Sequence, residues 1–172
     1  MLKNKLIKCF DSYQDFPKEG ILFRDVLPVL ARPDLLEELT EEMANLEMVK
    51  NSDAIVGIDA RGFVFGTAVA LIAKKPLILA RKPGKLPGDL ITESYELEYG
   101  KNTLCIQKKS IDDFKKFCII DDLLATGGTA ACVEKMLFNN GKSITGLAVI
   151  VELSSLNGRN KLNSNVSAQV SF

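Results

Sequence analysis

The 172-residue sequence contains no histidine, and this absence removes several classes of active site. A Ser-His-Asp triad, a Cys-His pair and a histidine-ligated metal are all excluded. Proton transfer near neutral pH must then use a carboxylate, a lysine, a tyrosine, a cysteine, a backbone group or water. We therefore expect the chemistry of this protein to rest on acidic, basic and hydroxyl side chains.

The sequence also lacks an excess of charge of either sign. It has 22 Lys and Arg residues against 22 Asp and Glu residues, so its formal net charge is zero. Proteins that bind nucleic acid generally carry a basic excess. We expect no nucleic-acid partner, although a local anion site is compatible with this balance.

Features of secreted and membrane proteins are missing as well. The four cysteines form no C-x-x-C pair, and we interpret them as reduced thiols of a cytoplasmic protein. The longest apolar stretch, residues 62–73, is shorter than the ~20 residues that a membrane span requires. Residues 1–13 have no continuous apolar segment like that of a signal peptide. We expect no membrane partner.

Hydrophobic periodicity predicts an alternation of strands and helices within one domain, residues 1–172. Helices are expected at about 2–13, 33–48, 62–74 and 129–140, and strands at 54–59, 76–80, 117–121 and 143–153. This order is typical of an α/β fold with a mostly parallel central sheet flanked by helices. The polar residues after 153 are expected to fray.

Residues 81–103 interrupt this alternation. They begin with two prolines and two glycines, and the apolar residues that follow alternate with polar ones as in a β-hairpin. An excursion of about 20 residues between regular elements is usually either a functional lid or a disordered segment. Its tyrosines and alternating pattern favour the lid.

The strongest local signal for function is residues 117–131, FCIIDDLLATGGTAA. An apolar strand runs into Asp121 and Asp122, and a turn of small residues, 125–129, then opens a helix. Parallel sheets bind ligands at the carboxyl ends of their strands, and the first amide groups of a helix attract phosphate. Gly127 and Gly128 let the backbone wrap around an anion.

The two acids suit a different part of the same ligand. A phosphate would repel Asp121 and Asp122, whereas the hydroxyl groups of a sugar would donate to them. The pattern thus predicts a ribose 5-phosphate site. It is neither a Walker A loop nor G-x-G-x-x-G. The structural alternative is an ordinary helix N-terminus after a turn.

Several segments, in order, resemble the type I phosphoribosyltransferases and, among them, the adenine phosphoribosyltransferase family. Residues 119–129 resemble the phosphoribosyl pyrophosphate signature of the type I enzymes. Five further segments resemble the adenine-specific family: 16–25, 57–66, 81–88, 95–100 and 151–159. The resemblance implies a β-hairpin lid at about 81–104 and an N-terminal hood at about 1–30 that contributes to the adenine site.

The resemblance also implies a reaction: transfer of a phosphoribosyl group from phosphoribosyl pyrophosphate to N9 of adenine, giving AMP and pyrophosphate in purine salvage. The 5-phosphate would lie in the turn of Ala125, Thr126, Gly127, Gly128 and Thr129, with Asp121 and Asp122 on the ribose hydroxyls. Mg²⁺ is the implied cofactor, bound mainly through the substrate near the two acids. A homodimer is also implied.

The remaining roles come from the same resemblance. Glu98, Tyr99 and Arg61 would be catalytic, with Glu98 near N7 of adenine. Phe23 and Leu123 would stack on the adenine ring, and the backbone of Leu22 and Arg24 would read its edge. Pyrophosphate would contact two segments, the turn Asp59, Ala60 and Arg61 and the basic cluster Arg81, Lys82 and Lys85. The resemblance implies a cis peptide in the turn.

Several of these residues also have an interpretation without a function in the site. An isolated phenylalanine such as Phe23 is more often a core residue, and Glu98 in a polar hairpin is more often solvated. Three other functions also fit parts of the pattern: a phosphoribosyltransferase for a 6-oxo purine or a pyrimidine, a non-catalytic regulator that senses phosphoribosyl pyrophosphate, and a generic nucleotide-binding domain.

Overall fold

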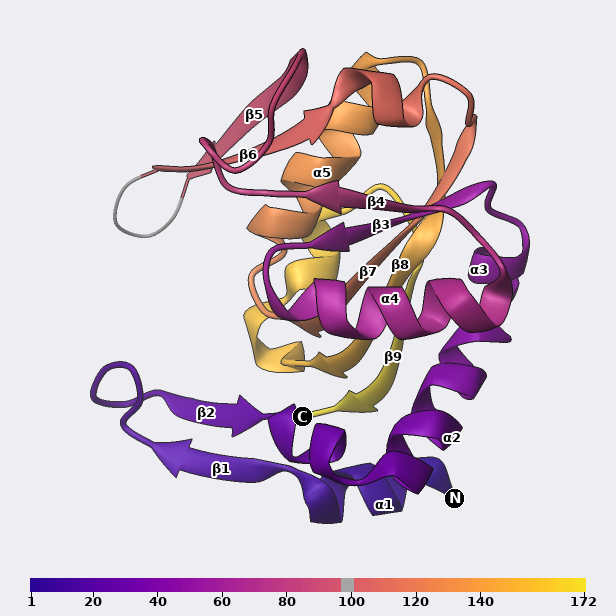
Figure 1. Cartoon of the computed structure of the whole chain (residues 1–172). Coiled ribbons are helices and arrows are strands. Elements are labelled where there is room, and N and C mark those ends of the chain that lie inside the picture. The colour runs from indigo at the N-terminus through magenta and orange to yellow at the C-terminus, as the bar shows by residue number, and fades with distance from the viewer. Residues whose placement is uncertain (97–100) are drawn as a thin grey trace.

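The computed structural model describes residues 1–96 and 101–172, and its centre is a five-stranded parallel sheet (Figure 1). The strands run in the order β4, β3, β7, β8, β9, and every neighbouring pair is parallel. Their bounds are β3 Ala54–Ile58, β4 Leu77–Ala80, β7 Lys116–Leu124, β8 Ser143–Glu152 and β9 Val166–Ser171. The predicted α/β class with a parallel central sheet is confirmed.

Helices cover both faces of this sheet. Successive side chains of a strand point to opposite faces, and both sets are apolar in the central strands. On one face, Cys118 and Ile120 of β7 pack with α2 (Pro33–Ala44) and α4 (Arg61–Ala73). On the other face, Phe117 and Ile119 pack with α5 (Gly128–Asn139). The central strands therefore read as continuous apolar runs, as expected for strands buried on both sides.

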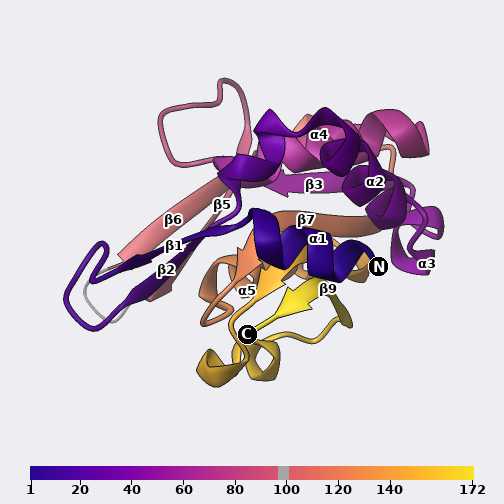
Figure 2. The ribbon, with the colours of Figure 1, turned by 90° about the horizontal axis from the view of Figure 1, so that it is seen from below.

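Two antiparallel strand pairs lie outside the central sheet. One joins β1 (Asp11–Gln14) to β2 (Leu22–Asp25), and the other joins β5 (Leu90–Glu96) to β6 (Lys101–Gln107). Both pairs project toward the same side of the molecule in Figures 1 and 2, which is also the side to which the arrowheads of β3 and β4 point. The carboxyl edge of the sheet is thus flanked by two extensions.

The first predicted helix is too long and the second is interrupted. α1 spans Leu2–Cys9, not 2–13, because residues 11–14 pair instead with β2. The expected helix over 33–48 divides into α2 and α3 (Glu47–Lys50). Short 3-10 helices complete the fold: η1 Leu27–Ala31, η2 Lys108–Ile111, η3 Ser154–Leu156 and η4 Gly158–Lys161. Within the described residues, none of the helices has the length and apolarity to cross a membrane.

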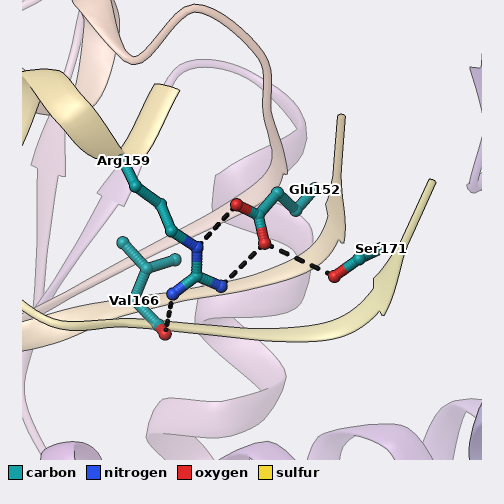
Figure 3. A network of polar contacts seen from close by, with 4 residues as sticks. All are labelled: Glu152, Arg159, Val166 and Ser171. Atoms are coloured by element: carbon teal, nitrogen blue, oxygen red, sulfur yellow. Dashed lines mark hydrogen bonds and ion pairs between the residues drawn. The ribbon is translucent and has the colours of Figure 1, made fainter. Parts of the chain in front are cut away.

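The prediction of a fraying tail is wrong. β9 forms the edge strand of the central sheet, and two buried carboxylates fasten the chain around it. Glu134 of α5 accepts hydrogen bonds from the backbone of Asn163 and Ser164, at 2.9 and 3.1 Å. Glu152 binds Arg159 and Ser171 (Figure 3). These polar contacts, together with the burial of Val170 in the core, hold the polar tail in place.

Candidate active site

A cavity of about 470 Å³ lies where β3 and β7 end, at the carboxyl edge of the sheet. Its wall combines two segments that are far apart in the sequence. One is the turn 59–61 after β3, and the other is residues 121–130, which run from the end of β7 into α5. The structure thus brings together most of the predicted sugar, phosphate and pyrophosphate residues, along with Leu123 of the predicted adenine site. Those in the wall are Asp59, Ala60, Arg61, Lys82, Asp121, Asp122, Leu123, Ala125, Thr126, Gly127, Gly128 and Thr129.

One end of the cavity is the phosphate cradle, a name used here for residues 125–129. Gly127 is the N-cap of α5 and has a left-handed backbone, with φ of 81°. Its conformation turns the chain so that α5 begins at the cavity, with Gly128, Thr129 and Ala130 in the wall. The first amide groups of a helix have no acceptor within the helix and carry its positive dipole end. The cradle can therefore receive an anion.

The two acids of β7 occupy different electrostatic environments. Asp122 is 5% exposed, and Arg61 donates from Nε to its Oδ2 at 2.5 Å. Burial of the guanidinium opposes its charge, but the Asp122 carboxylate raises the pKa of Arg61. The ion pair keeps Arg61 protonated and orients it at the cavity wall.

Burial, followed by repulsion from Asp122, raises the pKa of the Asp121 carboxyl well above its ordinary value. Its Oδ1 accepts a hydrogen bond from the backbone amide of Asp122 at 2.9 Å. Hydroxyl donors that reach Asp121 favour its charged form. A sugar diol in this cavity would therefore be matched by an acid with unused acceptor capacity.

The turn after β3 lies beside a second pair of cationic side chains, Arg81 and Lys82, which follow β4. The peptide between Asp59 and Ala60 is cis, as the resemblance implies. Arg81 donates from Nε to Asp59 at 3.3 Å, and its guanidinium lies 5.5 Å from the centre of the Phe63 ring. Lys82 reaches the cavity wall beside them. The cationic groups Arg61 and Lys82 thus lie on the same cavity as the phosphate cradle.

The residues predicted to hold a base lie beside this cavity. Phe23 is half-buried, packs edge-on against Phe16 with ring centres 5.1 Å apart, and has the Arg61 guanidinium 5.9 Å from its ring centre. It is therefore not a core residue. Leu22 and Arg24 line a second cavity of about 1010 Å³, which also touches Thr126 of the cradle. Leu123 lies in the wall of the first cavity.

Known proteins are similar to this chain over almost its whole length. Residues 29–165 match the family model described as the phosphoribosyl transferase domain. An adenine phosphoribosyltransferase of Prochlorococcus marinus strain MIT 9211 is 56% identical over 172 residues, which cover 100% of both chains. The chain belongs to the adenine phosphoribosyltransferase family.

Solved structures of this family superimpose closely on the fold. The Saccharomyces cerevisiae enzyme, solved with adenine and an imino-altritol 1,6-bisphosphate, has a TM-score of 0.93 and 36% identity, with 98% of each chain covered. The Thermoanaerobacter pseudethanolicus enzyme also has a TM-score of 0.93, at 34% identity and 99% coverage of each chain. The fold is therefore the type I phosphoribosyltransferase fold.

Two polar residues of the described wall, Tyr95 and Asn102, were missed by the sequence analysis. Tyr95 of β5 and Asn102 of β6 are paired across the strands, and both line the first cavity. Thr129 donates to the Tyr95 hydroxyl at 3.1 Å, and a Cβ on Gly128 would lie only 3.2 Å from the Tyr95 ring. Tyr95 thus ties the β5–β6 pair to the cradle. The alternation in residues 94–107 was a usable signal, because it places one face of both strands together.

Five predicted residues of this family site are not placed in the described wall of either cavity. Phe23 and Arg81 contact other residues of the site but line neither cavity. Glu98 and Tyr99 lie outside the described residues. Lys85 is exposed and is absent from the described wall of either cavity discussed here. Their roles stay predictions.

The side chains at the cavity are compatible with a magnesium ion held mainly by substrate. Asp121 and Asp122 offer oxygen ligands, which Mg²⁺ prefers, but Asp122 is already paired with Arg61. Among the described residues, no group of three or more cysteine, aspartate or glutamate side chains is arranged to hold a metal. Mg²⁺ commonly keeps several waters and binds through one or two carboxylates and the phosphates of its substrate.

Proposed function

We propose that this protein transfers the phosphoribosyl group of phosphoribosyl pyrophosphate to N9 of adenine, giving AMP and pyrophosphate in purine salvage. The relatives that carry this name are similar over the full length of the chain. The observation that carries the proposal is the single cavity that joins an anion-binding helix start, a pair of acids and two cationic groups. A ribose with phosphate at both ends has that order of charges.

Each end of the substrate then has a matching wall. The cradle binds the 5-phosphate with the first amides of α5, and Asp121 and Asp122 accept from the ribose hydroxyls. Pyrophosphate lies against Arg61 and Lys82. When N9 attacks the anomeric carbon, the bond to pyrophosphate breaks and negative charge grows on the leaving group. Fixed cations that face this charge stabilise the transition state.

The adenine edge is read by the backbone of β2. Among the described strands, β2 pairs only with β1, so its other edge presents backbone N–H and C=O groups. A carbonyl there accepts from the 6-amino group, and an amide donates to N1 of the ring. Phe23 and Leu123 supply apolar surface for the two ring faces. A 6-oxo purine has the opposite donor pattern and leaves these groups unpaired.

Proton transfer is assigned to Glu98, with Tyr99 beside it. Adenine must lose a proton from the attacking ring system, and without histidine a carboxylate is the natural acceptor. The segment that contains these residues follows β5 in sequence, directly between the described positions Glu96 and Lys101. Tyr95 and Asn102, one residue further out on each side, line the cavity.

Mg²⁺ completes this proposal as the cofactor. When bound, it would neutralise charge on the pyrophosphate and its bridging oxygens. Asp121 and Asp122 are the groups of this chain that would face it.

An assay of AMP formation tests the proposed reaction. We expect AMP from adenine and phosphoribosyl pyrophosphate when Mg²⁺ is supplied, and a kcat/KM for hypoxanthine at least about 30-fold lower, because two unpaired groups at about 1 kcal/mol each give that factor. Guanine, xanthine and orotate serve as further bases. Faster turnover of any of these than of adenine would assign the protein another base. No turnover of any base would favour a regulator or a generic nucleotide-binding domain.

We also propose that the protein is a homodimer that works in the cytoplasm, where its free thiols stay reduced. α4 packs on the sheet through its buried face, yet its outer face exposes Val64, Leu71 and Ile72 by 46%, 74% and 42%. These apolar residues fit an interface with a second copy. We expect Leu71→Glu to halve the mass measured by light scattering. Leu156 is likewise exposed but belongs to η3 and lines the second cavity, so Leu156→Glu is the control. A wild-type monomer would contradict the dimer.

A further inference from the structure

The segment after β8, which no role has yet been given, rests directly on the phosphate cradle. Gly158 is buried, and a Cβ at this position would collide with the carbonyl oxygen of Ala125 and lie 3.1 Å from the amide nitrogen of Gly127. In the reverse direction, a Cβ on Gly127 would collide with the carbonyl oxygen of Gly158. The two backbones are therefore in contact without side chains between them.

Arg159, the next residue, fixes this segment to the sheet (Figure 3). Its Nε and Nη2 donate to the two oxygens of Glu152 at 2.6 and 2.7 Å, and its Nη1 donates to the carbonyl oxygen of Val166 at 2.8 Å. One guanidinium thus joins the end of β8 to the start of β9. A fork of this kind is strong because both partners are charged and its geometry is fixed.

The carboxylate of the pair is itself held in place. Glu152 is 7% exposed, and Ser171 of β9 lies within 3.4 Å of its Oε2. Hydrogen bonding from Arg159 lowers the pKa of Glu152. Leu153, the next residue, donates from its backbone to Leu124 at 2.9 Å, directly before the cradle. The Glu152–Arg159 pair and the cradle therefore both adjoin the ends of β7 and β8.

Arg159 itself lies outside the described wall of the cavity. We propose that Arg159 is a positioning residue for the 5-phosphate: paired with Glu152, it keeps the backbone of Gly158 against residues 125–127 and so holds the cradle in its anion-binding shape. This inference rests on the proposed function, because it assigns the cradle to the phosphate of that substrate. It gives a role to the part of residues 151–159 that the reaction does not otherwise use.

The test compares AMP with adenosine, which lacks only the phosphate. We expect Arg159→Gln to weaken AMP binding about tenfold by calorimetry, which corresponds to about 1.4 kcal/mol, and adenosine binding less than about twofold. In the assay, KM for phosphoribosyl pyrophosphate should rise while KM for adenine changes little. Glu152→Gln should act in the same direction. Arg159→Lys keeps the charge but not the fork, so its AMP affinity should lie between those of wild type and Arg159→Gln.

Lys5→Gln is the matched control, because it removes another 2.6 Å ion pair, between α1 and α2, far from the cradle in the chain. It should leave the AMP-to-adenosine ratio unchanged. Equal losses for AMP and adenosine in Arg159→Gln, or no loss for either, would overturn the inference. If Arg159→Gln does not fold, the ratio for Arg159→Lys decides by the same criterion. A wild-type protein that forms no AMP would instead refute the proposed function.

Discussion

The double substitution of Asp121→Asn and Asp122→Asn is expected to weaken binding of phosphoribosyl pyrophosphate about 10³-fold, from two charge-assisted hydrogen bonds at about 2 kcal/mol each. Adenine binding should change less than about threefold, since the base lies against β2 and Leu123. Calorimetric titration with each ligand separates the two effects. An amide still accepts a hydrogen bond, so the main change at each position is the loss of charge.

The single variants divide this effect between the two acids. Asp121→Asn keeps the ion pair of Arg61 with Asp122, so it isolates the contact with the diol. Asp122→Asn also frees Arg61 and should therefore disturb the pyrophosphate end as well. Affinities for adenine and phosphoribosyl pyrophosphate that fall by equal factors would mean that the pair only holds the fold.

The centre of the fold could be predicted from the sequence because its signals are local. Continuous apolar runs such as residues 54–58 and 117–120 identify strands buried on both sides. The apolar helix between residues 54–58 and 77–80 implies a parallel connection of those two strands. The site follows from the same order. In a parallel sheet, polar residues placed just after two adjacent strands must meet at one edge, so residues 59–61 and 121–129 were brought together correctly.

The errors arose where pairing between distant segments decides the structure. The helical spacing of residues 2–10 was extended to residue 13, but residues 11–14 form β1 because residues 22–25 offer a partner. The tail after residue 153 is polar, yet it forms β9 because β8 has a free edge and Glu134 and Glu152 bind its backbone and side chains. Composition does not contain this information, since long-range contacts override local propensity.

The same limit explains why Tyr95 and Gly158 were missed as parts of the site. Each was inside a segment that the family resemblance covered, but neither has a feature that shows its neighbour in space. Their importance is a matter of close approach: Tyr95 to Gly128, and Gly158 to the cradle. An added Cβ would collide with backbone at Gly158 and would press on the Tyr95 ring at Gly128, 3.2 Å away. A glycine that permits close contact between two backbones is therefore as much a part of this site as a charged group.

Gly127→Ala is expected to reduce AMP affinity and kcat/KM by about 10²–10⁴-fold. This range corresponds to the loss of two amide hydrogen bonds to phosphate at about 1.5–3 kcal/mol each. Two effects combine at this position. The left-handed backbone, with φ of 81°, costs an L-residue about 1–2 kcal/mol. The new methyl group would also collide with the carbonyl oxygen of Gly158, which belongs to a backbone that Arg159 anchors.

Gly141→Ala separates these two effects, because Gly141 follows the other end of α5 with φ of 70° and has no atom within 4 Å of an added Cβ. It carries the backbone cost alone. We expect it to lower the free energy of unfolding by about 1–2 kcal/mol, with AMP affinity unchanged. If AMP binds Gly127→Ala as tightly as it binds Gly141→Ala, the cradle does not hold the phosphate. A selective loss in Gly127→Ala would mean that AMP affinity depends on the backbone shape of the cradle, which the left-handed Gly127 and its contact with Gly158 set together.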